Sequence, residues 1–309
     1  MQYIFCYSVL LFLFVLCANA KPNNRIFFIS DAQEPIWLET LYLKTERNKD
    51  ATSALQADIL QQDFAALFML GDMVSTNAKS KWARIDSFIH KLQDKKIPVY
   101  ATPGNHEYMM RKNSGRKSFI NRFGYDATIG TVQNIDSVAV ILLNSNIKKL
   151  TKTEQQQQIK WYIHTMDSLE CDNSIQTIIV CTHHSPYTNS SVVSPSAEVL
   201  NRFIPKFQHT DKARLFLSGH SHNLEYFTKD DKNFVVIGGG GGLRQSLRTG
   251  NKQRHTDLLQ PENKLRFFYL TVTRQENQLI LDIRGFISGD KLDTVETKTI
   301  GTVNWYKSS

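Results

Sequence analysis

Residues 25–33 read Arg-Ile-Phe-Phe-Ile-Ser-Asp-Ala-Gln, a continuous apolar run that ends in polar side chains. Residues 65–72 repeat the arrangement as Ala-Ala-Leu-Phe-Met-Leu-Gly-Asp, and a third apolar run covers residues 97–102. Short apolar runs of this kind indicate buried strands. Because helical periodicity separates the three runs, the order predicts a βαβαβ unit with parallel strands and right-handed crossovers.

The rest of the chain continues the alternation and then changes its pattern. Helical spacing predicts helices over 51–62, 79–95 and from Thr151 or Thr153 to about Leu169, the last opening with a capping box. Further buried strands are expected at 138–143, 175–181 and 215–218. Beyond residue 222, short antiparallel strands are expected at 234–237, 266–273, 279–285 and 294–302. The predicted fold class is α/β, a four-layer α/β/β/α sandwich of two mixed β-sheets flanked by helices.

Five polar clusters follow the apolar runs. In parallel sheets ligands gather outside the carboxyl ends of the strands, so these clusters are expected to meet at one edge. They combine hard oxygen donors with imidazoles, which suits Zn, Mn, Fe or Co. The clusters are Ser30-Asp31-Ala32-Gln33, Gly71-Asp72-Met73, Gly104-Asn105-His106-Glu107, Thr182-His183-His184-Ser185-Pro186 and Gly219-His220-Ser221-His222.

The order of these clusters resembles that of the calcineurin-like metallophosphoesterases. The resemblance covers nearly all of residues 25–227, and its most specific parts are Gly104–Glu107 and Gly219–His222. It implies a two-metal centre in which a bridging hydroxide attacks the phosphate ester. The implied metal ligands are Asp31, Gln33, Asp72, Asn105, His183, His220 and His222, with Asp72 as the bridge.

The resemblance also implies roles for two residues that hold no metal. His106 is expected to stabilise the developing charge or to protonate the leaving oxygen. Glu107 is expected to orient His106 through a hydrogen bond. The alternative interpretation, loop polar residues and packed core histidines, explains single members of the set better than the whole constellation.

Gln33 departs from the family pattern, in which a histidine takes its place. An amide oxygen is a harder and weaker donor than imidazole and favours Mn among the divalent ions considered, namely Mn, Fe and Zn. The Asp-x-Gln motif is similar to that of manganese-dependent ADP-ribose and CDP-alcohol diphosphatases. Residues 219–224 are partly similar to purple acid phosphatases, but Ser75 replaces their metal-bound tyrosine, which predicts a site without the purple charge-transfer band.

Three weaker features accompany this set. His183 is preferred over His184 as the metal ligand, which leaves His184 as a candidate for the substrate pocket. Asn144 ends a strand at the same edge and is a candidate substrate contact. Gly238–Gly242 is interpreted either as a backbone approach to phosphate or, preferably, as a tight strained turn.

The first twenty residues predict a cleaved signal peptide. Residues 4–16 are almost wholly apolar but short for a membrane span, and Ala18-Asn19-Ala20 resembles a cleavage signal. The predicted organisation is therefore a signal peptide at 1–20 and one metallophosphoesterase domain at 21–309. Localisation is expected to be secreted or periplasmic, with membrane anchoring less favoured. Cys171 and Cys181 are expected to stay free and buried, because a helix end and a late strand position lie too far apart to pair.

Bulk composition excludes little. The net charge of +8 is compatible with anionic substrates, but no dense Lys/Arg block indicates a nucleic-acid surface, so solubility is the preferred explanation. The expected partner is a small anionic phosphate ester, with no nucleic acid and no membrane span after signal cleavage. Two alternatives stay open: a nucleotide phosphodiesterase or diphosphatase, and a non-catalytic binding protein with an impaired first metal site.

Overall fold

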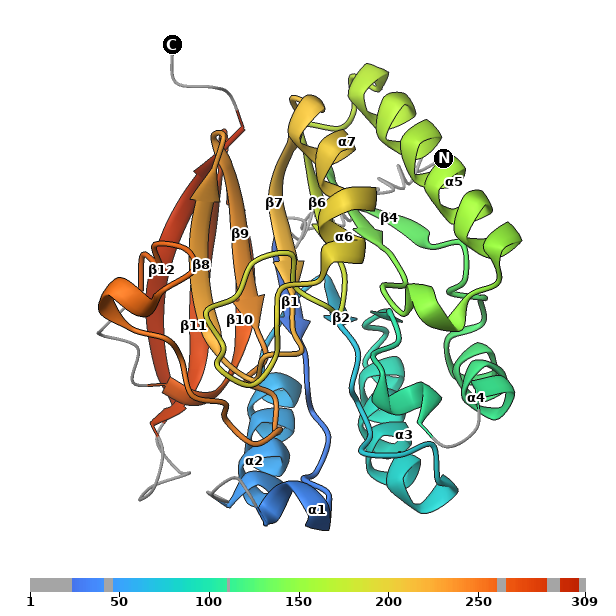
Figure 1. Cartoon of the computed structure of the whole chain (residues 1–309), viewed down its shortest axis with the longest axis vertical. Helices are drawn as coiled ribbons and strands as arrows, with labels where there is room; N and C mark the ends of the chain where they lie inside the picture. The colour runs from blue at the N-terminus through green and yellow to red at the C-terminus, as the bar shows by residue number, and fades with distance from the viewer. Residues whose placement is uncertain (1–23, 42–46, 110–111, 260–264, 288–294, 306–309) are drawn as a thin grey trace, which may run out of the picture.

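A computed structural model of the chain describes residues 24–41, 47–109, 112–259, 265–287 and 295–305. The two β-sheets pack face to face through a shared apolar cluster, with helices outside them (Figure 1). The predicted α/β/β/α sandwich of two mixed sheets is therefore confirmed. The predicted signal peptide lies outside the described residues.

The first sheet has the strand order β12-β11-β10-β1-β2-β3. β1, β2 and β3 are parallel, as the βαβαβ pattern predicted, and β10, β11 and β12 continue antiparallel from β1. The parallel strands are short because each stops where its polar cluster begins. The bounds are β1 Arg25–Ile29, β2 Ala66–Met69, β3 Val99–Ala101, β10 Leu265–Gln275, β11 Gln278–Ile287 and β12 Glu296–Asn304.

The second sheet has the strand order β4-β5-β6-β7-β9-β8. Its four central strands are parallel, whereas the edge strands β4 and β8 are antiparallel to their neighbours. The sequence pattern predicted neither of these two edge strands. The bounds are β4 Thr131–Ile135, β5 Val138–Leu142, β6 Thr177–Cys181, β7 Ala213–Ser218, β8 Leu224–Lys229 and β9 Lys232–Ile237.

The helices cover the outer faces of both sheets. The capping box at Thr151 is confirmed, because its hydroxyl accepts the backbone N–H of Glu154 while the Glu154 carboxylate accepts the N–H of Thr151. Tyr162 and Met166 of this helix are buried, whereas Ile163, the residue after Tyr162, is 41% exposed. The bounds are α1 Trp37–Thr40, α2 Asn48–Gln61, α3 Lys79–Asp94, α4 Lys112–Phe123, α5 Lys152–Cys171, α6 Ala197–Arg202 and α7 Ile204–His209, with short 3₁₀ helices η1 His106–Tyr108, η2 Ile147–Lys149 and η3 Gly250–Lys252.

Three apolar clusters hold the layers together. The central cluster takes side chains from both sheets, including Phe28 and Phe68 of the first and Val140 and Leu217 of the second. The outer clusters join the first sheet to α2 and α3, and the second sheet to α5 and α7. Alternate residues of the buried strands serve the inner and outer clusters, which explains why the strands read as continuous apolar runs.

The thiols and the helices bear on two further predictions. Both cysteines of the described residues are free, as predicted, but only Cys181 is buried, since Cys171 lies exposed at the end of α5. Among the described residues, no helix combines the length and the hydropathy that crossing a bilayer requires.

Candidate metal centre

Four residues of the polar clusters share an uncommon backbone conformation. Asp31, Asp72, His220 and His222 have φ values of 59°, 49°, 71° and 49°, in the left-handed region that side chains with a Cβ rarely adopt. Asp31 and Asp72 lie shortly after β1 and β2, and His220 and His222 lie shortly after β7. Backbone strain of this kind is concentrated at functional sites.

Asp31, Asp72 and His222 form the first group. One ligand atom from each lies within 4.8 Å of the others, and all three side chains are buried. His222 Nδ1 lies 2.7 Å from the carbonyl oxygen of Leu243, which only accepts, so Nδ1 carries a proton. The Nε2 lone pair is therefore directed at Asp31, whose Oδ1 lies 3.4 Å away. This is the arrangement in which a histidine binds a metal ion.

Gln33 completes this group. In the orientation that turns its amide nitrogen toward acceptors, the nitrogen donates to the backbone carbonyls of Asp72 at 2.7 Å and Asp31 at 3.1 Å. The amide oxygen then lies 3.1 Å from His222 Nε2. Because two carbonyls fix the nitrogen, the oxygen is held toward the same point as the imidazole lone pair. The geometry therefore fits the predicted amide ligand, with Gln33 fully buried.

The second group contains His183, His184 and His220, whose ligand atoms also lie within 4.8 Å of one another. His183 Nδ1 lies 3.0 Å from the carbonyl oxygen of Leu70, which leaves Nε2 as the lone-pair donor. That Nε2 lies 3.2 Å from Asp72 Oδ2 and 3.3 Å from Asn105 Oδ1. Asp72 thus belongs to both groups, as a bridging ligand must.

The buried carboxylates of the centre shift the pKa values of the histidines around them. Burial lowers the pKa of His183, but the neighbouring charge of Asp72 outweighs it and raises that pKa to about 9. Burial opposes ionisation of Asp72, yet the charges of His183 and His106 hold its pKa well below the usual range. Burial and the nearby His183 lower the pKa of His184 to about 3, so this imidazole is neutral. Two metal ions would balance the negative charge of the carboxylates while every histidine stayed neutral, and the donor set fits such a pair.

His106 lies beside this centre, and its two ring nitrogens face Ser75 and Asp72. Nδ1 donates to the carbonyl oxygen of Ser75 at 2.8 Å, and Nε2 lies 3.8 Å from Asp72 Oδ2. Burial lowers the pKa of His106, but Asp72 and the bond to Ser75 shift it upward. The upward shift of its pKa favours the protonated imidazole, which can donate a proton to a leaving oxygen. Sequence reasoning missed Ser75 as its partner, since a backbone carbonyl leaves no residue signature.

The prediction that Glu107 orients His106 is wrong. The Glu107 carboxylate instead accepts four backbone N–H groups, from Asp72 at 3.0 Å, Met73 at 2.7 Å, Val74 at 3.3 Å and Gly104 at 2.6 Å. These amides belong to the turns that follow β2 and β3. Glu107 therefore joins two ligand-bearing turns, and its effect on the centre passes through the backbone positions of Asp72 and Asn105.

The glycine run Gly238–Gly242 lies beneath the first group. None of its glycines has a positive φ, so a strained turn does not explain the run. Close packing does: a Cβ on Gly242 would lie 2.5 Å from the His222 ring, and one on Gly240 would lie 2.4 Å from the carbonyl oxygen of Ser30. The N–H groups of Gly240 and Gly242 donate to Ser30 and Asp31, so these two amides are not free for a phosphate.

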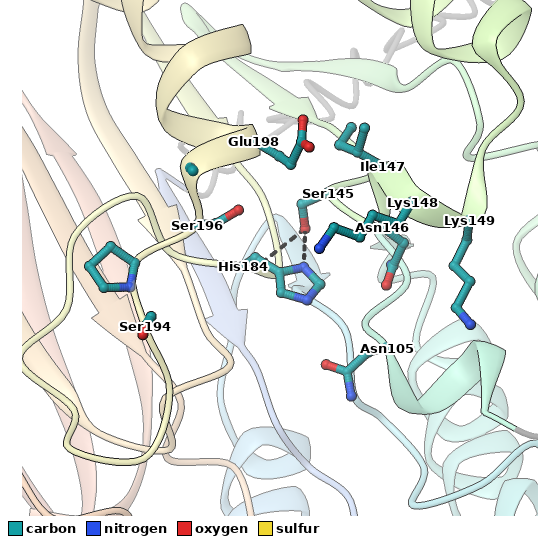
Figure 2. Close-up of a pocket in the computed structure, with 12 residues that line it drawn as sticks. Asn105, Ser145, Asn146, Ile147, Lys148, Lys149, His184, Ser194, Ser196 and Glu198 are labelled. Carbon is teal, nitrogen blue, oxygen red and sulfur yellow. Dashed lines mark hydrogen bonds between the residues drawn. The ribbon is translucent and has the colours of Figure 1, made fainter.

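A cavity of about 480 Å³ adjoins the second group. Figure 2 shows His184 and Asn105 near its middle. Ser145 Oγ lies 2.8 Å from His184 Nδ1, which fixes the ring at the cavity wall, and a substrate contact by His184 stays a prediction. Asn144 does not line the cavity: it is fully buried, donating to Tyr108 and accepting from the backbone of Asn146. The prediction for Asn144 is therefore wrong, because the chain turns and presents the next residues instead.

The remaining histidines take no part in the centre. His90, His164 and His209 are exposed, and His255 packs its ring against Tyr187 and Phe227. They are surface or packing residues.

A family model described as calcineurin-like phosphoesterase matches residues 24–224, which include every predicted metal ligand. The chain belongs to the calcineurin-like phosphoesterase family. The family is described as a phosphoesterase family, and this chain is a phosphoester hydrolase. The family implies a dinuclear metal site. The finer similarity to ADP-ribose and CDP-alcohol diphosphatases stays a prediction, and no curated protein matches the chain.

Solved structures share the fold at low identity. A purple acid phosphatase from yellow lupin has a TM-score of 0.62 and 13% identity over 86% of this chain and 53% of its own. A dimetal phosphatase from Danio rerio has a TM-score of 0.56 and 14% identity over 91% of this chain and 100% of its own. GAP50, described as the anchor in the inner membrane complex of Plasmodium, has a TM-score of 0.60 and 13% identity over 91% and 90%.

These likenesses establish the fold alone. The chain spans about half the length of the lupin phosphatase. Because the calcineurin-like fold also occurs in a protein described as an anchor, the fold alone does not determine catalysis, which depends on the metal centre of this chain.

Proposed function

We propose that this calcineurin-like phosphoesterase hydrolyses small phosphate esters at a two-metal centre. The observation that carries the proposal is the convergence of His183 Nε2, Asp72 Oδ2 and Asn105 Oδ1 opposite the group formed by Asp31, His222 and Gln33. Asp72 is the shared ligand between the two. Retention of every donor, with only Gln33 changed in kind, argues against the alternative of a non-catalytic binding protein.

The residues divide the work as follows. Asp31, Gln33, Asp72 and His222 would hold one ion, and Asp72, Asn105, His183 and His220 the other. Two metal ions held by these residues would supply an activated water as nucleophile and would neutralise charge on the phosphoryl oxygens. His106, whose pKa is shifted upward by Asp72 and the carbonyl oxygen of Ser75, would donate to the leaving oxygen or stabilise its charge. Glu107 and Gly238–Gly242 keep the ligand-bearing turns in position.

The first ion is proposed to be Mn in preference to Zn. The amide oxygen of Gln33 is a harder and weaker donor than the histidine usual in the family. Iron also fits this donor set. A nucleotide-like phosphodiester or diphosphate stays open as the substrate, alongside a phosphomonoester.

Export is a further proposal. It is supported by the apolar run and the Ala18-Asn19-Ala20 signal in the sequence, with residues 21–309 as the mature phosphoesterase domain. The mature protein is proposed to be secreted or periplasmic. Amino-terminal sequencing of the protein from its native source would reveal Lys21 as the first residue, and an intact Met1 would contradict the proposal.

Turnover with and without metal tests the catalytic proposal. The mature protein is stripped of metal, checked by elemental analysis, and supplied separately with Mn, Zn or Fe. Hydrolysis of a chromogenic monoester, a diester and a diphosphate is then measured. We expect turnover only in the metal-loaded samples, with Mn highest. Full activity in the stripped protein would refute the metal-dependent mechanism, and absence of turnover under every metal would favour a binding protein.

A further inference from the structure

The cavity beside the second metal group has a basic wall that the reaction itself does not need. Lys148 and Lys149 of η2 line it and are exposed, and Figure 2 places them on one side of His184, with Ser194 and Ser196 on the other. Neither ammonium group has an ion-pair partner among the described residues. Two adjacent cations at the mouth of a cavity favour an anionic occupant.

The acidic side chain in this wall is already neutralised. The Glu198 carboxylate accepts from Arg202 Nε at 2.8 Å across one turn of α6. Arg202 is held further by Gln155, which accepts from its guanidinium at 3.1 Å. The Glu198–Arg202 pair contributes little net charge, so the lysines determine the charge that the cavity presents.

The lysine-bearing turn is fixed to the metal centre. The Asn146 amide donates to the carbonyl oxygens of Pro103 at 2.9 Å and Gly104 at 3.2 Å, immediately before the predicted ligand Asn105. From the other side, the Gln155 amide donates to the carbonyl oxygens of Ile147 and Leu150. The turn thus keeps its place relative to Asn105 and His184. An anion bound by the lysines would therefore lie at a set offset from the scissile phosphate.

We propose that this cavity binds a second anionic group of the substrate, separate from the phosphoryl group that is cleaved. This inference rests on the proposed function, and it narrows the substrate class to esters whose leaving portion carries a phosphate or a carboxylate. The lysines supply the charge, and the Ser196 hydroxyl, which accepts the backbone N–H of Val199, can donate its own hydrogen to the anion. The volume of about 480 Å³ accommodates a small organic leaving group of this kind.

Binding of non-hydrolysable probes tests the inference without depending on turnover. Calorimetry with excess Mn compares three compounds on one carbon skeleton: propylphosphonate, phosphonobutyrate and trimethylene bisphosphonate. We expect the two probes with a second anion to bind roughly tenfold more tightly than propylphosphonate. A preference for the bisphosphonate alone would identify phosphate as the second group, and a preference for both would identify a general anion site.

Matched double variants assign the preference to the lysines. Lys148→Met with Lys149→Met is expected to abolish it while leaving propylphosphonate affinity unchanged. Lys152→Met with Lys160→Met removes the same charge from exposed positions of α5 outside the cavity and is expected to retain it. Equal binding of all three probes by the unmodified protein, or a preference that survives the first double variant, would overturn the inference. Turnover measured in parallel separates the two proposals: lysine-dependent preference without hydrolysis contradicts only the proposed function.

Discussion

The carboxylate of Glu107 accepts the backbone N–H of Asp72 at 3.0 Å. It also accepts the N–H groups of Met73, Val74 and Gly104, so one buried side chain holds the turns after β2 and β3 together. Asp72 itself accepts the backbone N–H of His106 at 2.8 Å. Asp72, the predicted bridging ligand, is therefore held at two places. Glu107 accepts its backbone N–H, and its own carboxylate accepts the backbone N–H of His106.

Glu107→Gln is expected to weaken folding and metal binding together. The amide keeps one acceptor but turns its NH₂ toward backbone N–H groups, leaving buried donors unsatisfied at about 1–3 kcal/mol. Urea unfolding and elemental analysis measure the two effects, with the exposed Glu276→Gln as the matched control. Normal stability and metal content accompanied by slow turnover would instead restore a role for Glu107 in orienting His106.

His106→Asn is expected to remove most turnover, on the order of 10²–10⁴-fold, because a positioned acid is lost. Metal content should stay nearly unchanged, since His106 bonds Ser75 and only approaches Asp72. The loss should be larger for esters with poor leaving groups, which depend most on proton donation. Steady-state kinetics over a series of leaving groups checks this, with the exposed His90→Asn as control. Near-complete kcat on a poor leaving group would contradict the assignment.

Gln33→His is expected to tighten the first metal site and to shift its preference from Mn toward Zn, because imidazole is the softer donor. The replacement also removes the two bonds from the amide nitrogen to Asp31 and Asp72, so the thermal stability of the metal-free protein should fall. Competitive Mn and Zn titrations of both proteins measure the preference, with the exposed Gln157→His as control. Identical titrations would mean that Gln33 binds no metal and only holds the backbone.

Glu225 is expected to make stability depend on pH. Burial raises the pKa of this carboxyl to about 7, although Thr188, Asn189 and Ser221 all donate to it. Because the folded pKa exceeds the unfolded value of about 4.3, the stabilising contribution is complete below pH 4 and is lost as pH rises through 7.

Unfolding free energies from pH 5 to 8 test this dependence. The unmodified protein should lose stability relative to Glu225→Gln across that window, since the variant cannot titrate. The variant itself is expected to be less stable at pH 5, because an amide nitrogen would face one of the three donors. Parallel pH profiles for the two proteins would show that Glu225 is ionised throughout.

Much of this molecule follows from its sequence alone. The apolar runs ending at Asp31, Asp72 and His183 predicted parallel strands, and parallel strands bring their carboxyl ends to one edge. The polar clusters that contain the candidate ligands were therefore predictable from the sequence, as was the capping box of α5 at Thr151. These features depend on residue type and spacing within short segments, which a sequence states directly.

The tertiary structure decided which partner each polar side chain meets. Glu107 was expected beside His106, but it lies among the amides of two turns. Asn144 was expected in the pocket, but it is buried beside Tyr108. In both cases the partner belongs to a segment distant in sequence, or is a backbone group that no residue type marks. Hydrogen bonds form where the packing of the two sheets brings donors and acceptors together, and that packing depends on the whole chain.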